Sequence, residues 1–359
     1  MQGLTANDHR LKAKLRGMGA RSEQLEPSMT AVVSAFSLDG TPRTMTRVAG
    51  AWSHRVYRLE TSVNVYAVKQ ILDPWEDPSW RLWLAEAWEF ELAAFYAGVS
   101  MPRPVAGPDG GCLADVESDD AERLLPVRVH EWADATPCPA GPVRKDVAER
   151  LAQDLAKMHA VRHFPRRREV FPRPSRDNVD GWPELVERLR AVDPDLAGVA
   201  ADISPWIGRV GELFDAADHD VDGLPMSHGD IDQKNVLLGN DGPVLCDWDV
   251  AMPWDGRVEL ARTAMSLARW ERPDVAGWVI TAYQSAGGEA ASVSPQDLAV
   301  DLVLGVDWLV LCLERATGLR AADAQRQYES RTMISQLMAE VPEHVRTALN
   351  IQTWLTGTS

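Results

Sequence analysis

The chain has 359 residues, of which 45% are hydrophobic and 25% are charged, a composition typical of a globular protein with a large core. Its 53 acidic residues outnumber its 37 basic ones and give a formal net charge of −16, which argues against a broad nucleic-acid or anionic-membrane partner. Excess acid can line a cleft for a cationic substrate, but more often it forms a solvated surface. The length allows two domains or lobes.

The cysteines point to a reducing compartment. The four lie far apart and form no Cys-x-x-Cys pair, so neither a disulfide framework nor a zinc site is indicated (Cys112, Cys138, Cys246 and Cys312). The N-terminus lacks the apolar core of a signal peptide, and the sequence holds no apolar run long enough to span a membrane. We therefore expect a soluble cytoplasmic protein.

The N-terminal part predicts strands after a polar leader. Residues 1–30 are polar and helix-compatible, and we expect a leading helix or a frayed arm. Apolar residues then predict strands that are joined over a glycine-containing bend and a short turn. These strands are Thr44–Ala49, His54–Thr61 and Val65–Leu72, with the bend at Gly50–Ser53 and the turn at Ser62–Asn64.

Lys69 lies on the last of these strands. The two-residue period of a strand places it on one face with Val65, Ala67 and Ile71. A lysine on a mostly apolar face needs a polar partner or must extend to the edge of the sheet. The pattern therefore indicates a specific role for this side chain.

Residues 79–97 predict a helix that carries a carboxylate on its apolar face. Glu91 shares the apolar stripe, where a charge is costly unless it is paired. Lys69 is its natural partner, although Glu89 and Glu86 on the same helix are alternatives to Glu91. Gly98 ends the helix. The apolar stripe consists of Leu84, Trp88, Leu92 and Phe95.

A change of composition marks the boundary between two lobes. Leu124–Trp132 reads as an apolar strand, and a stretch rich in proline and glycine follows it through Pro142. We therefore expect an N-terminal lobe of residues 1–130 and a C-terminal lobe of residues 131–359.

The second lobe is predicted to be mostly helical. Lys145–Arg162 forms a helix in which His159 is expected to be a buried, hydrogen-bonded residue and not a catalytic one. Residues 163–176 read as an arginine-rich loop. Helical segments separated by Pro194 and Pro205 follow, and the end of this region, Leu213–Asp222, is rich in acid. Further helices are expected from Glu259 to residue 350.

The segment Ser227–Leu238 predicts a polar loop that runs into a hairpin. Asn240-Asp241-Gly242 supplies residues that tolerate positive φ in a tight turn. Pairing across this turn places Asn235 opposite Cys246 or Asp247, beside the loop that carries Asp230. An amide oxygen and a carboxylate suit Mg²⁺, which takes its other ligands from phosphates and water. Asp230 is then left to accept a proton, which indicates phosphoryl transfer.

In detail this segment resembles the aminoglycoside phosphotransferase/choline kinase family. The resemblance rests on His228-Gly229-Asp230, Asn235 and Asp247-Trp248-Asp249, and it extends from about Gly50 to Ala261. It implies an α+β fold of the two-lobed protein-kinase type. The small lobe would contain an antiparallel sheet and one main helix, and the larger lobe would be mostly helical. Glu259-Leu260-Ala261 matches a structural signature of the family.

The resemblance also implies roles within the catalytic lobe. Asp230 would deprotonate the acceptor hydroxyl, and Asn235 and Asp247 would hold Mg²⁺, while His228 would brace the loop. Asp232 stands where protein kinases carry a lysine two residues after the catalytic aspartate, and whether Lys234 substitutes for that lysine is open.

The remaining implied residues bind the nucleotide. A lysine with a glutamate behind it would steady the α- and β-phosphates, and backbone N–H groups of the glycine-containing bend would meet the phosphates. The linker Val129–Trp132 would hold the adenine. The residues implied are Lys69, Glu91, Ser53, His54, His130 and Trp132.

Together these patterns predict an ATP-dependent kinase that phosphorylates a hydroxyl of a small molecule, such as an aminoglycoside-like antibiotic or a metabolite. An alternative is a kinase that phosphorylates Ser or Thr of a peptide in a modified-peptide pathway, and a third is a nucleotide-binding pseudokinase. The acid-rich Leu213–Asp222 favours a cationic small molecule, whereas the tryptophan content is compatible with a peptide. GTP in place of ATP stays open.

Overall fold

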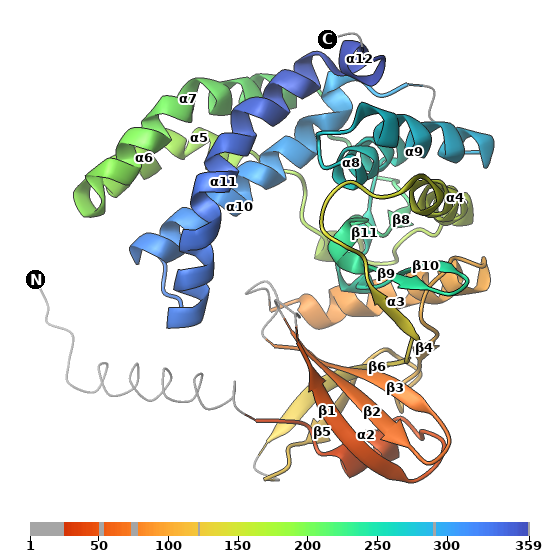
Figure 1. Cartoon of the computed structure of the whole chain (residues 1–359). Helices are drawn as coiled ribbons and strands as arrows, with labels where there is room; N and C mark the ends of the chain where they lie inside the picture. The colour runs from red at the N-terminus through yellow and green to blue at the C-terminus, as the bar shows by residue number, and fades with distance from the viewer. Residues whose placement is uncertain (1–24, 50–53, 73–77, 121–122, 290–291, 358–359) are drawn as a thin grey trace, which may run out of the picture. The chain divides into compact units, whose positions relative to one another are not determined.

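The computed structural model describes residues 25–49, 54–72, 78–120, 123–289 and 292–357 (Figure 1). The chain divides into two compact units, which we describe separately. The N-terminal unit contains the described parts of residues 1–95 and 101–134, and the C-terminal unit contains those of residues 96–100 and 135–359. Within the described ranges, no helix combines the length and the apolar composition that a membrane crossing requires.

The N-terminal unit is built on an antiparallel sheet of six strands. Four of them match strands predicted from the sequence, and all six pair antiparallel. The sheet order is β1 (Pro42–Val48), β2 (Arg55–Thr61), β3 (Val65–Gln70), β6 (Leu124–Glu131) and β4 (Pro104–Val105), and β5 (Ala114–Glu117) also pairs with β6.

The two faces of this sheet have different chemistry. On β3 the alternation buries Tyr66 and Val68 in an apolar core that helix α2 (Met29–Ala35) contacts through Val32. Lys69 points to the other face. Because directly paired residues lie on the same side of a sheet, the register Lys69↔Arg128 and Ala67↔His130 places these basic residues of β6 on that second face.

Helix α3 (Trp80–Tyr96) matches the helix predicted over residues 79–97. Leu84 and Trp88 pack with Cys112 in a cluster of their own. Glu91 is fully buried, as its place on the apolar stripe predicted. The chain then reaches Gly98 with φ at +79°, a conformation that suits the end of a helix.

The C-terminal unit is mostly helical, as predicted. Its α-helices are α4 (Lys145–Val161), α5 (Asp177–Asp180), α6 (Trp182–Val192), α7 (Pro194–Asp215), α8 (Gly256–Ala268), α9 (Pro273–Ser285), α10 (Ala299–Thr317), α11 (Ala324–Leu349) and α12 (Ile351–Leu355). Short 3₁₀ turns lie at η1 (Arg168–Val170), η2 (Gln233–Asn235), η3 (Trp248–Val250) and η4 (Pro295–Leu298).

One expected helix break is wrong. Helix α7 continues through Pro205, which the sequence analysis placed between two helices. A proline inside a helix removes one hydrogen bond and costs about 3 kcal/mol. Ile203 and Ile207 on either side are buried, and we attribute the unbroken helix to this packing.

Two small sheets lie next to the loop that carries Asp230. Strands β9 (Val236–Gly239) and β10 (Gly242–Leu245) form the predicted hairpin, and β7 (Ala135–Pro137) adds to the free edge of β9. Strand β8 (Met226–Ser227) pairs with β11 (Met252–Pro253) just before the loop begins. In the turn, Gly242 takes the positive φ, at +121°.

Candidate active site

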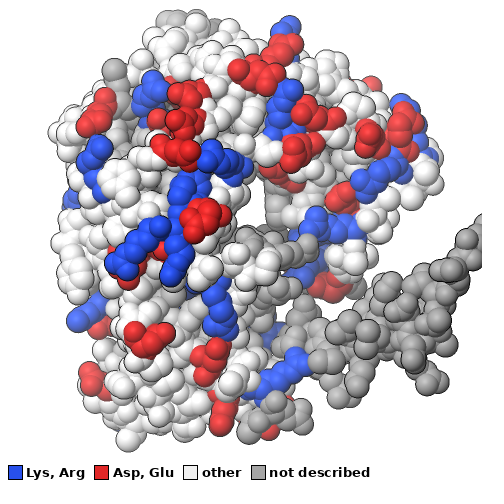
Figure 2. Space-filling model, turned by 180° about the vertical axis from the view of Figure 1, so that it is seen from behind, with Lys and Arg blue, Asp and Glu red and all other residues white. Residues whose placement is uncertain are grey.

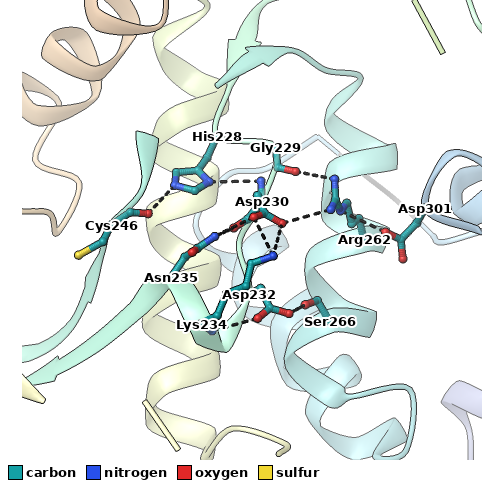
Figure 3. A network of polar contacts seen from close by, with 10 residues as sticks. All are labelled: His228, Gly229, Asp230, Asp232, Lys234, Asn235, Cys246, Arg262, Ser266 and Asp301. Atoms are coloured by element: carbon teal, nitrogen blue, oxygen red, sulfur yellow. Dashed lines mark hydrogen bonds and ion pairs between the residues drawn. The ribbon is translucent and has the colours of Figure 1, made fainter. Parts of the chain in front are cut away.

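The loop between β8 and η2 carries the predicted base, Asp230 (Figure 3). Gly229 directly before it has φ at +74°, and a Cβ atom there would lie 2.2 Å from Nε1 of Trp254. Only glycine fits both the backbone conformation and the space. The loop therefore packs closely against the buried Trp254 at Gly229, the residue directly before Asp230.

Three side chains contact the carboxylate of Asp230 through a hydrogen bond or an ion pair. Asn235 donates to Oδ2 at 2.8 Å, Lys234 reaches the same oxygen at 3.1 Å, and Arg262 donates to Oδ1 at 3.2 Å. Burial alone would raise the pKa of Asp230, but the charges of Lys234 and Arg262 more than offset it and hold the pKa below its ordinary value. The group is therefore ionised and chemically able to accept a proton.

His228 links this loop to the hairpin. Its Nε2 donates to the carbonyl of Cys246 at 3.0 Å, and its Nδ1 accepts the backbone N–H of Asp230 at 3.2 Å. These contacts define a neutral imidazole, and burial lowers the pKa of His228 in agreement with them. The ring also packs edge-on against Trp248, with centroids 4.8 Å apart.

Asn235 lies next to the second predicted metal ligand. The backbone N–H of Cys246 donates to the Asn235 carbonyl at 2.8 Å, so Asn235 sits across from the residue before Asp247, as the hairpin register predicted. Asp247 adopts a left-handed conformation with φ at 66° and ψ at 59°. Such backbone costs about 1–2 kcal/mol for most residues, and Asp and Asn tolerate it best.

The donor atoms here fit a hard divalent cation. The amide nitrogen of Asn235 makes both hydrogen bonds to Asp230, one to its carbonyl and one to its carboxylate, so the amide oxygen is the atom left to bind a metal. Asp247 adds carboxylate oxygens. The described residues contain no cluster of three or more His, Cys, Asp or Glu that could hold a metal alone. Mg²⁺ that is bound through few protein oxygens takes its remaining ligands from water and phosphates.

Glu259 and His159 support the loop of Asp230 through hydrogen bonds. Neither residue was predicted from the sequence to belong to the site. The backbone N–H of Gly229 donates to Glu259 at 2.6 Å, and the other oxygen of Glu259 lies 2.7 Å from Nε2 of His159. Burial would raise the pKa of Glu259, but its contact with His159 lowers it. His159 also contacts the Tyr283 hydroxyl at 2.7 Å, so it is hydrogen-bonded as expected, although it is partly and not fully buried.

Helix α8 supplies two further contacts that the sequence analysis missed. Arg262 reaches Asp230, and Ser266 donates to Asp232 at 2.6 Å. Asp232 also accepts the backbone N–H of Lys234 at 2.9 Å and so begins the 3₁₀ turn η2. The available signal was the four-residue spacing of Arg262 and Ser266, which places both on one face of a helix.

In the N-terminal unit, Glu91 has two basic partners whose pairing with it was not predicted from the sequence. Arg128 forms a buried ion pair with its carboxylate, and Nε2 of His130 lies 2.7 Å from the other oxygen. The sequence feature that could have indicated this ion pair is an arginine inside an apolar strand. Lys69 shares this face of the sheet through its pairing with Arg128, and its predicted pairing with Glu91 stays a prediction.

The other predicted nucleotide-binding residues are placed as follows. His54 accepts the backbone N–H of Leu72 through Nδ1 at 3.3 Å. The backbone N–H of Trp132 donates to Val65 at 3.0 Å, and Arg58 lies over the Trp132 ring. Ser53, with the rest of the bend at residues 50–53, lies outside the described residues, as do residues 1–24 of the leader that was predicted over residues 1–30.

In the acid-rich segment that was expected to favour a cationic acceptor, two of the four aspartates form ion pairs with arginines. Asp222 binds Arg173 at 2.7 Å, and Asp215 forms an ion pair with Arg176. Both arginines come from the loop that the sequence analysis described as arginine-rich. Acidic and basic side chains likewise lie beside one another over much of the face in Figure 2. These two pairs offset part of the segment's negative charge, and its preference for a cationic acceptor stays a prediction.

A comparison with family models matches residues 44–294, more than half of the chain, to a family described as "Phosphotransferase enzyme family". No curated protein matches the chain. The match includes the Asp230 loop and the hairpin that carries Asp247.

Solved structures share the fold. A spectinomycin phosphotransferase in complex with ADP and spectinomycin has a TM-score of 0.65 and 13% identity, over 88% of this chain and 97% of that one. An amicoumacin kinase in complex with AMP-PNP, Ca²⁺ and its ligand has a TM-score of 0.56 and 14% identity, over 85% of this chain and 90% of that one. A choline/ethanolamine kinase family protein from Mesorhizobium loti has a TM-score of 0.51 and 16% identity, over 89% of this chain and 97% of that one. The predicted α+β, protein-kinase-like fold is confirmed.

Proposed function

Because the chain belongs to the phosphotransferase enzyme family, we propose that it transfers the γ-phosphate of ATP to a hydroxyl group of a small molecule. The observation that carries the proposal is the cluster of Asp230, Asn235 and the residues around Asp247. It presents an ionised carboxylate beside an amide oxygen, on a loop held by His228 and Glu259.

Asp230 is the base in this proposal. It takes the proton of the acceptor hydroxyl while the hydroxyl oxygen bonds to the γ-phosphorus and the bond from that phosphorus to ADP breaks. The products are a phosphorylated acceptor and ADP. Bound Mg²⁺, held by Asn235 and Asp247, would neutralise charge on the phosphates. Such catalysis consists mainly of positioning and charge stabilisation.

The nucleotide contacts are proposed for residues of the N-terminal unit. Lys69 steadies the α- and β-phosphates, and Glu91, fixed by Arg128 and His130, is the carboxylate behind it. Backbone groups near Ser53 and His54 and the strand end at His130–Trp132 complete the nucleotide site. ADP and AMP-PNP in the similar structures support nucleotide binding. ATP as donor agrees with the cytoplasmic location expected from the sequence.

The acceptor is proposed to be a small hydroxylated molecule, such as an aminoglycoside-like antibiotic or a metabolite. The similar structures named for spectinomycin and amicoumacin support this class. The test is a mass-spectrometric screen for a phosphate-sized shift with MgATP and mixed acceptors, including spectinomycin, amicoumacin, aminoglycosides, choline and Ser/Thr peptides. Asp230→Ala is the control.

A small molecule that gains phosphate with the wild type and not with Asp230→Ala supports the proposal. A phosphorylated peptide alone would move the assignment to the peptide kinase considered from the sequence. Tight MgATP binding without any phosphorylated product would contradict an active kinase.

A further inference from the structure

Arg262 joins the catalytic loop to two helices of the C-terminal unit (Figure 3). Its Nη1 donates to the carbonyl of Gly229 at 2.6 Å, and its Nη2 donates to Oδ1 of Asp230 at 3.2 Å. Its Nε lies 3.1 Å from Oδ1 of Asp301 on α10. Because a guanidinium is planar and rigid, contacts through all its nitrogens fix both its position and its orientation.

These contacts lie where charges act strongly on one another. The side chains of Arg262, Asp230 and Asp301 are 21%, 19% and 18% exposed. Lys234, which also reaches Asp230, is 63% exposed. Salt and water screen an exposed pair much more than a partly buried one. Arg262 also lies over the ring of Trp254, 5.6 Å from its centroid, which supports it from a further side.

Arg262 differs from the other partners of Asp230 in its origin. Asn235 and Lys234 lie in the 3₁₀ turn η2, which directly follows the loop of Asp230, so they are within five residues of the carboxylate that they contact. Among the described side chains in contact with that carboxylate, Arg262 is the one that comes from a distant part of the chain. It also holds the Gly229 carbonyl, so one group fixes both the backbone and the side chain of the loop.

We propose that Arg262, anchored by Asp301, is a positioning residue that holds the Asp230 carboxylate in the orientation in which it receives the acceptor proton. The proposal rests on the function proposed above. Without Arg262 the carboxylate can turn within the loop, and a misplacement of about 1 Å can lower turnover about 100-fold. None of the proposed nucleotide contacts involves Arg262, so nucleotide binding should be retained.

The test compares Arg262→Gln, Arg262→Lys and Asp301→Asn with a matched control on the same helix. Arg257→Gln removes the same charge from α8, but Arg257 is 62% exposed and pairs with Asp255 at 3.7 Å. The readouts are kcat and the KM for MgATP, with the acceptor that the wild type phosphorylates among spectinomycin, amicoumacin, aminoglycosides, choline and Ser/Thr peptides. The Kd for MgAMP-PNP is measured separately.

We expect Arg262→Gln to lower kcat about 100-fold and Asp301→Asn about tenfold. The KM for MgATP and the Kd for MgAMP-PNP should change by less than about twofold, because these variants leave the nucleotide contacts intact. Arg262→Lys should recover only part of kcat, since an ammonium cannot span the carbonyl and the carboxylate together. Unchanged kcat in both Arg262→Gln and Asp301→Asn overturns the proposal, as does an equal loss of MgAMP-PNP binding.

Crystal structures of Arg262→Gln and Arg257→Gln separate this proposal from the proposed function. If the wild type phosphorylates no acceptor, the function fails, and the structures alone decide the positioning role. A turned or displaced Asp230 carboxylate in Arg262→Gln, with an unchanged one in Arg257→Gln, supports it. An unchanged carboxylate in both variants overturns it.

Discussion

Gly229 and Gly223 have similar backbone conformations but different surroundings. Their φ angles are +74° and +81°, while a Cβ atom would clash with Trp254 at Gly229 and would meet nothing within 4 Å at Gly223. Gly223→Ala should therefore lower the free energy of unfolding by about 1 kcal/mol, the cost of left-handed backbone. Gly229→Ala should lower it by about 2–4 kcal/mol, because Trp254 or the loop must also move.

Urea unfolding of the two variants measures this difference, and turnover measures its consequence. The Gly229→Ala protein should also lose most of its activity, since the loop that aims Asp230 is displaced. Equal stability of the two variants would show that the contact between Gly229 and Trp254 is not tight in solution.

Single residues also show what could be predicted from the sequence. Asp230 and Asn235 are found by local spacing, because both lie in one short segment whose conformation is set by neighbouring residues. The contact of Glu91 with Arg128 depends on how a helix docks on a sheet and on the register of a distant strand. Arg262 reaches Asp230 from 32 residues away in the chain. Local patterns identify site residues that lie close together in the sequence, and they miss contacts between elements that are distant in the sequence.

At the scale of elements, helix ends carry features that periodicity does not reveal. Helix α8 ends in consecutive left-handed residues, Arg269 and Trp270. This turn brings Trp270 onto His344 of α11, with ring centroids 4.3 Å apart and planes 17° from parallel. Pro205 inside α7 makes a related point, because tertiary packing can override a local helix breaker. Both features depend on contacts between elements that are distant in sequence.

The stack of Trp270 on His344 predicts a pH effect on stability. Burial, with a smaller effect of Arg269, lowers the pKa of His344 from 6.5 to about 4. Between these values the unfolded chain binds a proton that the folded chain does not. The contribution of His344 to stability is therefore complete above about pH 6.5. It falls as the pH drops towards 4, by at most about 1.4 kcal/mol per pH unit.

The variant His344→Phe keeps an aromatic ring at this position and has no titrating group. Denaturant unfolding of both proteins at pH 8 and pH 5 isolates the effect from that of the many carboxylates. The wild type should lose more stability than the variant over this interval. Equal losses would contradict a neutral, partly buried His344.

At the scale of the whole chain, the proposed binding of MgATP predicts a change in thermal stability. A ligand that binds only the folded chain stabilises it by about 2.7 kcal/mol at 100 times its Kd. MgATP should therefore raise the Tm by several degrees. Removing the metal with EDTA should take away most of that shift, because ATP then lacks the cation that Asn235 and Asp247 would hold.

Asp247→Asn tests whether the metal acts through this residue. Asn tolerates left-handed backbone as well as Asp does, so the variant keeps the conformation at φ 66° while it removes the negative charge. Asp241→Asn, in the exposed turn of the same hairpin, makes the same chemical change away from the proposed site. We expect Asp247→Asn to abolish turnover, to leave the circular dichroism spectrum unchanged and to lose the Mg²⁺-dependent rise in Tm, while Asp241→Asn behaves as the wild type. If Asp247→Asn keeps the full Mg²⁺-dependent rise in Tm, other residues hold the metal. A metal site that needs the Asp247 carboxylate loses affinity when the charge is removed.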